Sequence, residues 1–521
     1  MEKYRVFNLM KVILLISVLI LLVISCKQDS SDQYADKPPE NTDVVLEEDS
    51  LENEKYKPPE DQSIALLPNE WAGISNLPEI PHYNIQLKVD FGSGTFKGSS
   101  KINYTNLEEV DLDYLYFRLF PNGGWSYGNG FLKVYSVKVD DQEAQTELSL
   151  DDSVLKVKPS EPIIVGENIK ITINFDGKVS QDFEGGGYGI YNLSDDVLTL
   201  AGWFPILAVY DDEGWNLDPG SSIGDSVYSD MAFYSVELTA PDDLKVAATG
   251  SLADSQACED SQTCHSFVSG PARDFVMVLG RDFEIISKEV QGTKINAYYL
   301  PGHKDAAENT LSVATDSLKT FNSKFGSYPY TELDIVDVPM IEYIGVEFPG
   351  IVLNDSTVYG NAEYTSHEIA HQWWYNVVGN DVIDDPWLDE ALTMYSSIIY
   401  FEYNCTDEEY QEIFDYYEWE RQYIIRAGYD DLVTEGLDHF EELGEDRYGL
   451  IVYTKGALFF HSLREKIGDE AFFEALQEYY ELRKYQIASP EDLLNAFEKS
   501  SGKQLDDLYQ EWLYEKQLTL E

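Results

Sequence analysis

Two histidines four residues apart, with a glutamate between them, form the motif in this chain with the clearest potential for chemistry: His367, Glu368 and His371. Side chains at positions i and i+4 project from the same face of a helix, so both imidazoles can bind one metal ion. Eighteen residues separate His371 from Glu390, which we expect to supply a third ligand from a following helix. Three protein ligands leave one position for water, which is typical of a catalytic rather than a structural zinc site.

Glu368 has a different expected role. It lies between the two histidines and cannot reach the same side of the metal as a ligand, but it can accept a proton from a metal-bound water. The sequence therefore predicts one zinc ion per chain together with a general base. The alternative interpretation is that both histidines belong to the core of an amphipathic helix and bind no metal.

The elements that must position this motif differ between the two parts of the sequence. From about residue 81 to residue 300, apolar residues alternate with polar ones, as in residues 83–89 and 169–175. Many short strands separated by turn residues favour an antiparallel β-sandwich-like domain, which we place at residues 67–300.

After residue 300 the hydrophobic period changes. Residues 304–324 fit an amphipathic helix, 333–338 and 350–353 fit strands, and helical patterns follow one another from residue 362 to the C-terminus. The sequence therefore predicts an α+β multidomain chain in which residues 301–521 form a mixed and mostly α-helical domain that carries the histidine motif.

The beginning of the chain has the character of a targeting segment. Basic residues precede an apolar run at residues 12–24, which is too short for a comfortable bilayer span and fits the hydrophobic region of a signal peptide at residues 1–25. The run ends in LVISC, which resembles the bacterial lipobox and implies acylation of Cys26. The alternative is an N-terminal membrane anchor with an incidental cysteine. Both interpretations place the chain outside the cytoplasm, attached to a bacterial membrane.

The chain is strongly acidic, with a formal net charge of −59. Nucleic-acid binding depends on Lys and Arg displacing counterions from phosphates, so this charge excludes a nucleic-acid partner. It also argues against adhesion to anionic lipid, so the membrane contact is expected to depend on the acyl chains. Residues 26–66 are expected to be a disordered acidic tether, because they are rich in Asp, Glu, Ser and Pro.

Two cysteines flank a short polar loop in the β-rich region. Cys258 and Cys264 are separated by five residues, and a chain outside the cytoplasm can oxidise such a pair. We therefore expect a disulfide that closes a hairpin tip. A metal site with His265 is the alternative, but the sequence offers no fourth ligand nearby.

The spacing of the histidine motif and Glu390 resembles that of the gluzincin peptidases. Residues 387–391 (WLDEA) are similar to the WLNEG segment of the M1 family of zinc aminopeptidases. Residues 344–350 (IGVEFPG) resemble the family's GxMEN exopeptidase motif, and residues 452–457 (VYTKGA) resemble its YEKG segment. The resemblance covers roughly residues 70–520 and implies a thermolysin-like catalytic domain.

The resemblance also implies further site residues. Tyr453 would donate a hydrogen bond to the oxyanion of the tetrahedral intermediate, with Tyr448 as the alternative donor. Glu347 would hold the α-ammonium group of the substrate, and backbone near Gly345 would pair with the peptide as an edge strand. A carboxylate that binds the α-ammonium group at a fixed distance from the metal places the first peptide bond at the metal, so that cleavage is restricted to the N-terminal residue.

The expected function is therefore hydrolysis of N-terminal residues from peptides by a zinc-activated water. Val346 and Phe348 replace the Met and Asn of the family motif, so a zinc endopeptidase or another zinc hydrolase is an alternative. A catalytically silent surface binding protein on the same scaffold is a second alternative. The retained Glu368 argues against it.

Overall fold

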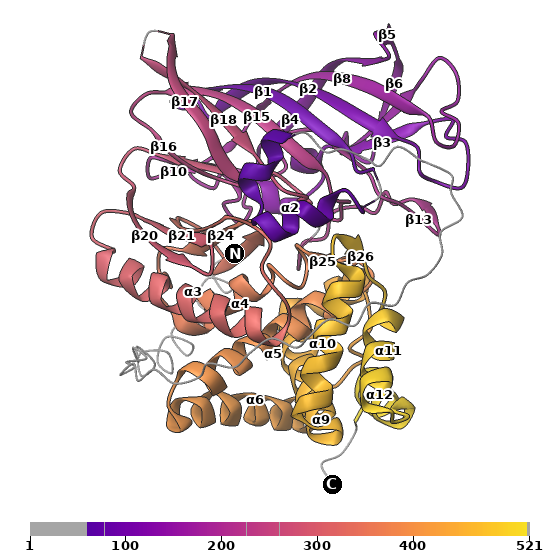
Figure 1. Cartoon of the computed structure of the whole chain (residues 1–521), viewed down its shortest axis with the longest axis vertical. Helices are drawn as coiled ribbons and strands as arrows, with labels where there is room; N and C mark the ends of the chain where they lie inside the picture. The colour runs from indigo at the N-terminus through magenta and orange to yellow at the C-terminus, as the bar shows by residue number, and fades with distance from the viewer. Residues whose placement is uncertain (1–59, 78, 226, 260, 518–521) are drawn as a thin grey trace.

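The computed structural model describes residues 60–517, except residues 78, 226 and 260. The proposed signal peptide, Cys26 and most of the expected tether lie outside the described residues. Within the described part of the chain, no helix combines the length and apolar character needed to cross a membrane. A β-rich half stands above a helical half in Figure 1, and the chain runs from the first into the second.

The β-rich half is built on a large twisted sheet of eight strands. Burial alternates along its strands, because one face of each packs inward and the other meets solvent. The strand order is β17 (Ser251–Glu259), β18 (Gln262–Val268), β15 (Phe233–Pro241), β1 (His82–Asp90), β2 (Thr95–Thr105), β8 (Asn168–Lys178), β4 (Phe131–Val139) and β5 (Gln142–Glu143).

Neighbouring strands in this sheet are antiparallel, as expected, with one exception. The first strand, β1, pairs in parallel with β15, so that Tyr83 lies opposite Tyr234. The two strands are distant in sequence, and alternation of apolar residues carries no information about strand direction. The sheet is therefore mixed at this one pair.

Smaller sheets cover the inner face of the large one, and their apolar residues form one core with it. A five-stranded sheet has the order β16 (Lys245–Ala248), β19 (Met277–Gly280), β11 (Val197–Leu200), β10 (Tyr191–Ser194) and β9 (Ser180–Gln181). A four-stranded sheet has the order β12 (Ile206–Leu207), β3 (Leu115–Arg118), β7 (Val154–Lys158) and β6 (Gln145–Ser149), and β13 (Tyr210–Asp211) pairs with β14 (Gly214–Trp215).

A separate five-stranded sheet leads into the helical half. Its order is β20 (Glu284–Val290), β21 (Thr293–Tyr299), β22 (Glu332–Val338), β24 (Ile351–Asp355) and β23 (Gly345–Phe348). The strands β20 and β21 precede the expected domain boundary at residue 301, yet they pair within this sheet rather than with the β-rich domain. The boundary therefore lies between β19 and β20, because a period-two pattern does not reveal which sheet a strand joins.

The residues just before the β-rich domain also depart from expectation. Residues 60–66, assigned to the tether, form the 3-10 helix η1 (Glu60–Ala65) and its exit, and Gln62, Ala65 and Leu66 are buried. The amide of Gln62 donates to Ser235 Oγ at 2.8 Å. These residues belong to the fold, and the helix α2 (Pro68–Ile74) follows them.

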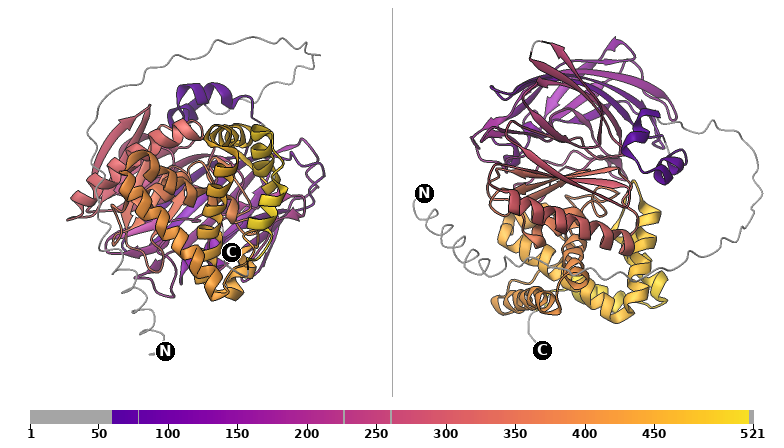
Figure 2. Two further views of the ribbon diagram at one scale, coloured as in Figure 1. Left: turned by 90° about the horizontal axis from the view of Figure 1, so that it is seen from below. Right: turned by 60° about the vertical axis from the view of Figure 1, so that its left-hand side comes forward.

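Helices build the rest of the molecule, and the long helix α3 lies against the β20–β24 sheet (Figures 1 and 2). The expected helix at residues 304–324 is present with those bounds. The helices are α3 (Lys304–Lys324), α4 (Ala362–Ala370), α5 (Trp387–Asn404), α6 (Asp407–Ala427), α7 (Leu437–Leu443), α8 (Glu445–Tyr448), the π-helix η4 (Gly449–Lys455), α9 (Gly456–Ile467), α10 (Asp469–Arg483), α11 (Pro490–Ser501) and α12 (Asp506–Leu513).

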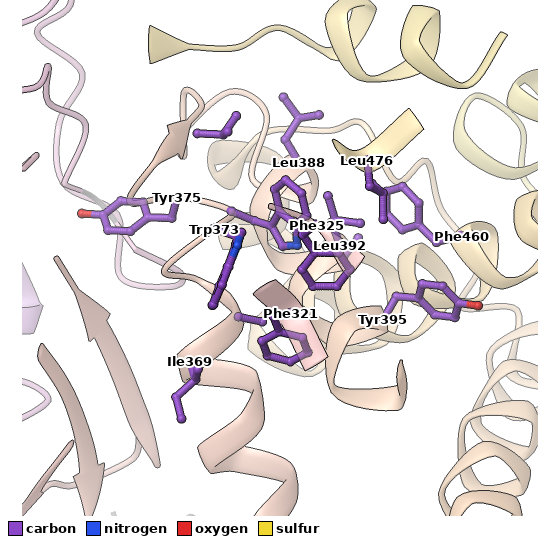
Figure 3. Packing of buried hydrophobic residues seen from close by; sticks show 14 of the residues in the cluster. Phe321, Phe325, Ile369, Trp373, Tyr375, Leu388, Leu392, Tyr395, Phe460 and Leu476 are labelled. Atoms are coloured by element: carbon purple, nitrogen blue, oxygen red, sulfur yellow. The ribbon is translucent and has the colours of Figure 1, made fainter. Parts of the chain in front are cut away.

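Buried aromatic side chains hold the helix α4 in place. Trp373 follows this helix and packs edge-on against Phe321 of α3, with ring centroids 5.5 Å apart. Its indole N–H donates to the carbonyl of Gly326 at 2.8 Å. Figure 3 shows how Leu388 and Leu392 of α5 join the same cluster. The fold class is confirmed: a β-rich domain followed by a mixed and helical domain.

Candidate active site

The helix α4 begins at a strong cap and ends at the second histidine of the motif. Asn361 is the N-cap residue, and its side-chain oxygen accepts hydrogen bonds from the backbone N–H groups of Glu363 and Tyr364. His371 is the C-cap residue, so one helical turn separates it from His367. This short segment is helical because its N-cap satisfies the first backbone N–H groups and because its apolar face is buried.

Three side chains converge on one point, as the motif predicts. The Nε2 atoms of His367 and His371 lie 3.2 Å apart, and each lies 3.4 Å from Oε2 of Glu390. Two ligands bound tetrahedrally at about 2.0–2.1 Å from a zinc ion are about 3.3 Å apart. The three distances therefore fit a single zinc ion. Oε2 of Glu390 is buried and accepts no hydrogen bond from the described residues, which a metal ion would correct.

The ring of His371 is oriented by a second layer of contacts. Its Nδ1 lies 3.1 Å from the carbonyl oxygen of Trp374 and 3.3 Å from Oγ1 of Thr393. An Nδ1–H that donates to a backbone carbonyl leaves Nε2 bare, which is the form that binds a metal. Trp374 is itself fixed by donating to Ser396 Oγ at 3.1 Å.

Tyr453 reaches the same site from the π-helix η4. Its hydroxyl donates to Oε1 of Glu390 at 2.5 Å, and its ring stacks on that of His367 with centroids 5.8 Å apart. Tyr448 packs edge-on against Tyr453, but its buried hydroxyl has no hydrogen-bond partner in the described part of the chain. Wide helical turns of this kind occur most often at functional sites.

The strand β23 forms one wall of the site at the edge of its sheet. A Cβ atom on Gly345 would lie 2.3 Å from Oε1 of Glu368, so only glycine leaves room for this carboxylate. Glu347 is buried on the same strand, and its Oε1 lies 3.6 Å from Nδ1 of His371. The structure thus brings both predicted residues of the strand to the motif.

Carboxylates outnumber cationic groups in this buried site. Burial and the neighbouring charges shift the pKa values of these carboxylates. Burial raises the pKa of Glu368 to about 8, and burial together with Asp225 raises that of Glu347 well above its usual range. Burial disfavours ionised Glu390 as well, but the imidazoles of His371 and His367 outweigh it and lower its pKa. The site as a whole favours an added positive charge.

Asp225 is a site residue that the sequence analysis missed. Burial, and then the carboxylate of Glu390, raise its pKa to about 7. It reaches the centre from a loop of the β-rich domain, far from every motif in the sequence. A single aspartate in an acidic chain carries no signal that could have identified it.

Asp225 and Glu347 line the same small cavity beside the three converging side chains. Its volume is about 20 Å³, enough for a water molecule or a small polar group. Tyr127, Tyr188 and Phe348 contribute to its walls. The cavity therefore combines two carboxylates with aromatic surfaces next to the site.

The remaining predicted residues lie away from this centre. Cys258 and Cys264 form a disulfide across the hairpin of β17 and β18, at the outer end of the large sheet (Figure 1). Cys26 lies outside the described residues.

Comparison with known protein families places this site in a recognised context. Residues 309–512 match the model described as the peptidase family M1 domain. This range includes the histidine motif, Glu347, Glu390 and Tyr453.

Curated relatives align beyond this range at low identity. Aminopeptidase 2 of Candida albicans is 21% identical over 472 residues, which cover 83% of this chain and 46% of the relative. Endoplasmic reticulum aminopeptidase 1 of Homo sapiens is 23% identical over 459 residues, 82% of this chain and 46% of the relative. The chain spans about half the length of these curated relatives.

Solved structures share the fold over most of the chain. A crystal structure of an M1 zinc metallopeptidase from Deinococcus radiodurans superposes with a TM-score of 0.65 at 18% identity, covering 85% of this chain and 95% of that one. A mutant of the same enzyme bound to a Tyr-Ser-Ala substrate superposes with a TM-score of 0.62 at 19% identity, with the same coverage of both chains.

Proposed function

We propose that this chain is a zinc-dependent aminopeptidase that releases N-terminal residues from peptides. The observation that carries the proposal is the convergence of His367, His371 and Glu390 at distances that fit zinc, beside a small cavity with two carboxylates. The match of residues 309–512 to the peptidase family M1 domain supports it. Curated relatives carry the name aminopeptidase, which supports the same reaction here.

Zinc held by these three side chains would supply a Lewis acid and a water of lowered pKa. Glu368 then acts as the general base: it accepts the proton of the attacking water and later delivers it to the leaving amine. Its carboxylate is fixed for this role against Gly345. The hydroxyl of Tyr453, close to Glu390, donates to the developing oxyanion.

Glu347 and Asp225 bind the α-ammonium group of the substrate. Both carboxylates line the small cavity, and neither makes an ion pair with Lys or Arg within the described residues. A cation that enters this cavity is desolvated between two acids, which favours the charged amine over an acylated one. The open edge of β23 pairs with the peptide backbone.

The test is digestion of matched peptides with free and N-acetylated termini by the purified full chain, followed by mass spectrometry. We expect release of single N-terminal residues from the free peptides only, and loss of this activity with a chelator. Glu368→Gln should reduce kcat about 10²–10⁴-fold while the zinc content, measured by atomic absorption, is unchanged.

Two other outcomes would favour the alternatives. Equal cleavage of acetylated peptides at internal bonds would indicate an endopeptidase. No cleavage of any peptide by the zinc-loaded chain would indicate a silent scaffold. Glu347→Gln distinguishes an aminopeptidase from an endopeptidase. In an aminopeptidase we expect this substitution to lower kcat/KM about 100-fold, and only for peptides with a free N-terminus.

We further propose that the chain is a lipoprotein held at the outside of a bacterial membrane through Cys26. The LVISC sequence after an apolar run supports this, and the high negative charge leaves the acyl chains as the means of attachment. Metabolic labelling with a fatty acid should mark the wild-type chain and not Cys26→Ser. Equal labelling of both would overturn the assignment.

A further inference from the structure

A second and larger cavity lies apart from the metal site, between the β-rich domain and the helical half. Its volume is about 270 Å³, close to the lower end of the range for small-molecule sites. The helical half contributes Tyr485 and the short strand β26 (Gln486–Ile487). None of the residues that line it also lines the small cavity at Glu347.

Aromatic side chains form much of the wall. Tyr83 and Tyr234 pack together with ring centroids 5.2 Å apart, and Tyr210 meets Trp215 edge-on at 5.3 Å. Tyr104 also lines the cavity. Aromatic faces carry negative electrostatic potential and attract ammonium and guanidinium groups within about 6 Å.

Acidic side chains complete the lining. Asp230, Glu108 and Glu79 line the cavity, and no Lys, Arg or His is among the described residues that do so. The Asp230 side chain is open to the cavity and makes no hydrogen bond or ion pair within the described part of the chain. Desolvation by the surrounding protein raises its pKa although the side chain is accessible through the cavity, with Arg273 opposing and Asp211 adding to the shift.

The nearest cation does not neutralise these acids by direct contact. The guanidinium of Arg273 donates to backbone carbonyls, including Ser229 at 2.9 Å and Gln486 at 2.7 Å. It forms no ion pair with Asp230 within the described residues. The cavity therefore keeps an excess of negative charge next to apolar surface.

Tyr485 lines the cavity on the side of the helical half. Its side chain is only 9% exposed, and its hydroxyl has no hydrogen-bond partner in the described structure. Its backbone is held at φ +64°, unusual for a tyrosine, while its N–H donates to the carbonyl of Val377 at 2.7 Å.

We propose that this cavity binds an organic cation: a primary ammonium or guanidinium group on an apolar stem. The stem packs against the tyrosines and Trp215, and the charged end meets Asp230 and Glu108. A metal ion fits less well, because the groups of three converging ligands found within the described residues all lie at the zinc site. The absence of a basic lining residue excludes an anion.

The same chemistry can come from a free amine or from a Lys or Arg side chain of a peptide. The test therefore uses phenethylamine and acetyl-Gly-Lys-Gly-amide as probes, with 2-phenylethanol as the neutral counterpart of the first. Binding is measured by calorimetry on the full chain that carries Glu368→Gln, so that turnover does not interfere. We expect one or both cations to bind saturably, and the alcohol at least tenfold more weakly than phenethylamine.

Three further substitutions identify the site. Asp230→Asn should weaken cation binding at least tenfold, whereas Tyr485→Phe, which removes only a hydroxyl that is not exposed to the cavity, should leave it unchanged. The matched control Asp212→Asn changes an exposed carboxylate nearby that does not line the cavity, and should have no effect. Melting curves check that each variant is folded.

Glu347→Gln separates this site from the proposed substrate site. Binding that survives Glu347→Gln and is lost in Asp230→Asn supports the second cavity, whether or not the chain proves to be an aminopeptidase. Binding lost only in Glu347→Gln places the amine at the metal site and overturns the proposal. Equal affinity for 2-phenylethanol and phenethylamine, or no binding of either cation, also overturns it.

Discussion

The position of the Glu368 carboxylate depends on the absence of a side chain at Gly345. The strand β23 approaches the helix α4 so closely at Gly345 that a Cβ atom there would lie 2.3 Å from the Glu368 carboxylate. We expect Gly345→Ala to displace the base and lower kcat about 10–100-fold, because an error of about 1 Å in a catalytic group costs on that order.

Zinc content should be unchanged in Gly345→Ala, since the three atoms nearest to an added Cβ all belong to Glu368. Gly73→Ala is the matched control, because a Cβ on Gly73 meets no atom within 4 Å. Steady-state kinetics on a dipeptide substrate measures both variants. Wild-type kcat in Gly345→Ala would show that Glu368 is not held by this contact.

The two neighbouring tyrosines have different surroundings, which allows their roles to be separated. The Tyr453 hydroxyl contacts Glu390, whereas that of Tyr448 has no partner in the described structure. Tyr453→Phe should lower kcat about 10²–10³-fold with little change in KM, as expected for a donor that acts in the transition state. The kcat of Tyr448→Phe should stay within a few-fold of the wild-type value. A larger loss of kcat in Tyr448→Phe than in Tyr453→Phe would identify Tyr448 as the donor instead.

At the scale of elements, short segments carry the site because longer ones anchor them. The edge strand β23 is held by pairing with β24, and α4 is held by its Asn361 cap and by Trp373 packed on α3. The docking of η1 on the β-rich domain follows the same rule through a polar contact. Nε2 of His82 in β1 lies 3.0 Å from Oγ of Ser235, and the amide of Gln62 in η1 donates to the same hydroxyl.

This contact predicts a pH dependence of stability. Burial lowers the pKa of His82 to about 4, while the unfolded value is about 6.5. Between these pH values the unfolded chain binds a proton that the folded chain does not, so stability is complete above pH 6.5 and falls as the pH drops toward 4.

Melting temperature measured from pH 7 to pH 4.5 tests this dependence. The carboxylates contribute to both chains equally, so the difference between wild type and His82→Gln isolates the imidazole. Wild type should lose a few degrees more than the variant over this range. Parallel curves would contradict the assignment.

At the scale of the whole molecule, one buried arginine ties three separate segments together. Arg273 donates to backbone carbonyls in all three segments. The acceptors are Tyr375 and Asn376 after the helix α4, Ser229 in the β-rich domain, and Gln486 in the helical half. A lysine has one compact ammonium group and cannot satisfy this set of carbonyls. Two carbonyls left unpaired cost about 2–6 kcal/mol.

Arg273→Lys should therefore lower the free energy of unfolding by about that amount, measured by urea denaturation. Arg281→Lys is the matched control, because Arg281 makes exposed ion pairs with Asp243 and Asp196. Such pairs contribute about 0–1 kcal/mol. Similar losses in both variants would mean that Arg273 does not connect the segments.

Much of the fold and most of the site could be predicted from local pattern. Period-two and period-3.6 sequences place β1, β8 and α3 correctly, because a side chain's alternation between core and solvent is a local property. The pairing of β20 and β21 with the second sheet, and the parallel contact of β1 with β15, could not be predicted. Strand partners are chosen by long-range contacts that leave no local trace.

The sequence by itself predicted which three side chains converge, because helical spacing puts His367 and His371 on one face and a second helix brings Glu390. Only the tertiary structure decided that Asp225, from a loop of the other domain, joins Glu347 in the small cavity beside the site. The same is true of the cavity around Asp230, whose walls come from segments hundreds of residues apart. Spacing along a helix is set by the backbone, whereas contacts between domains are set by the packing of whole surfaces.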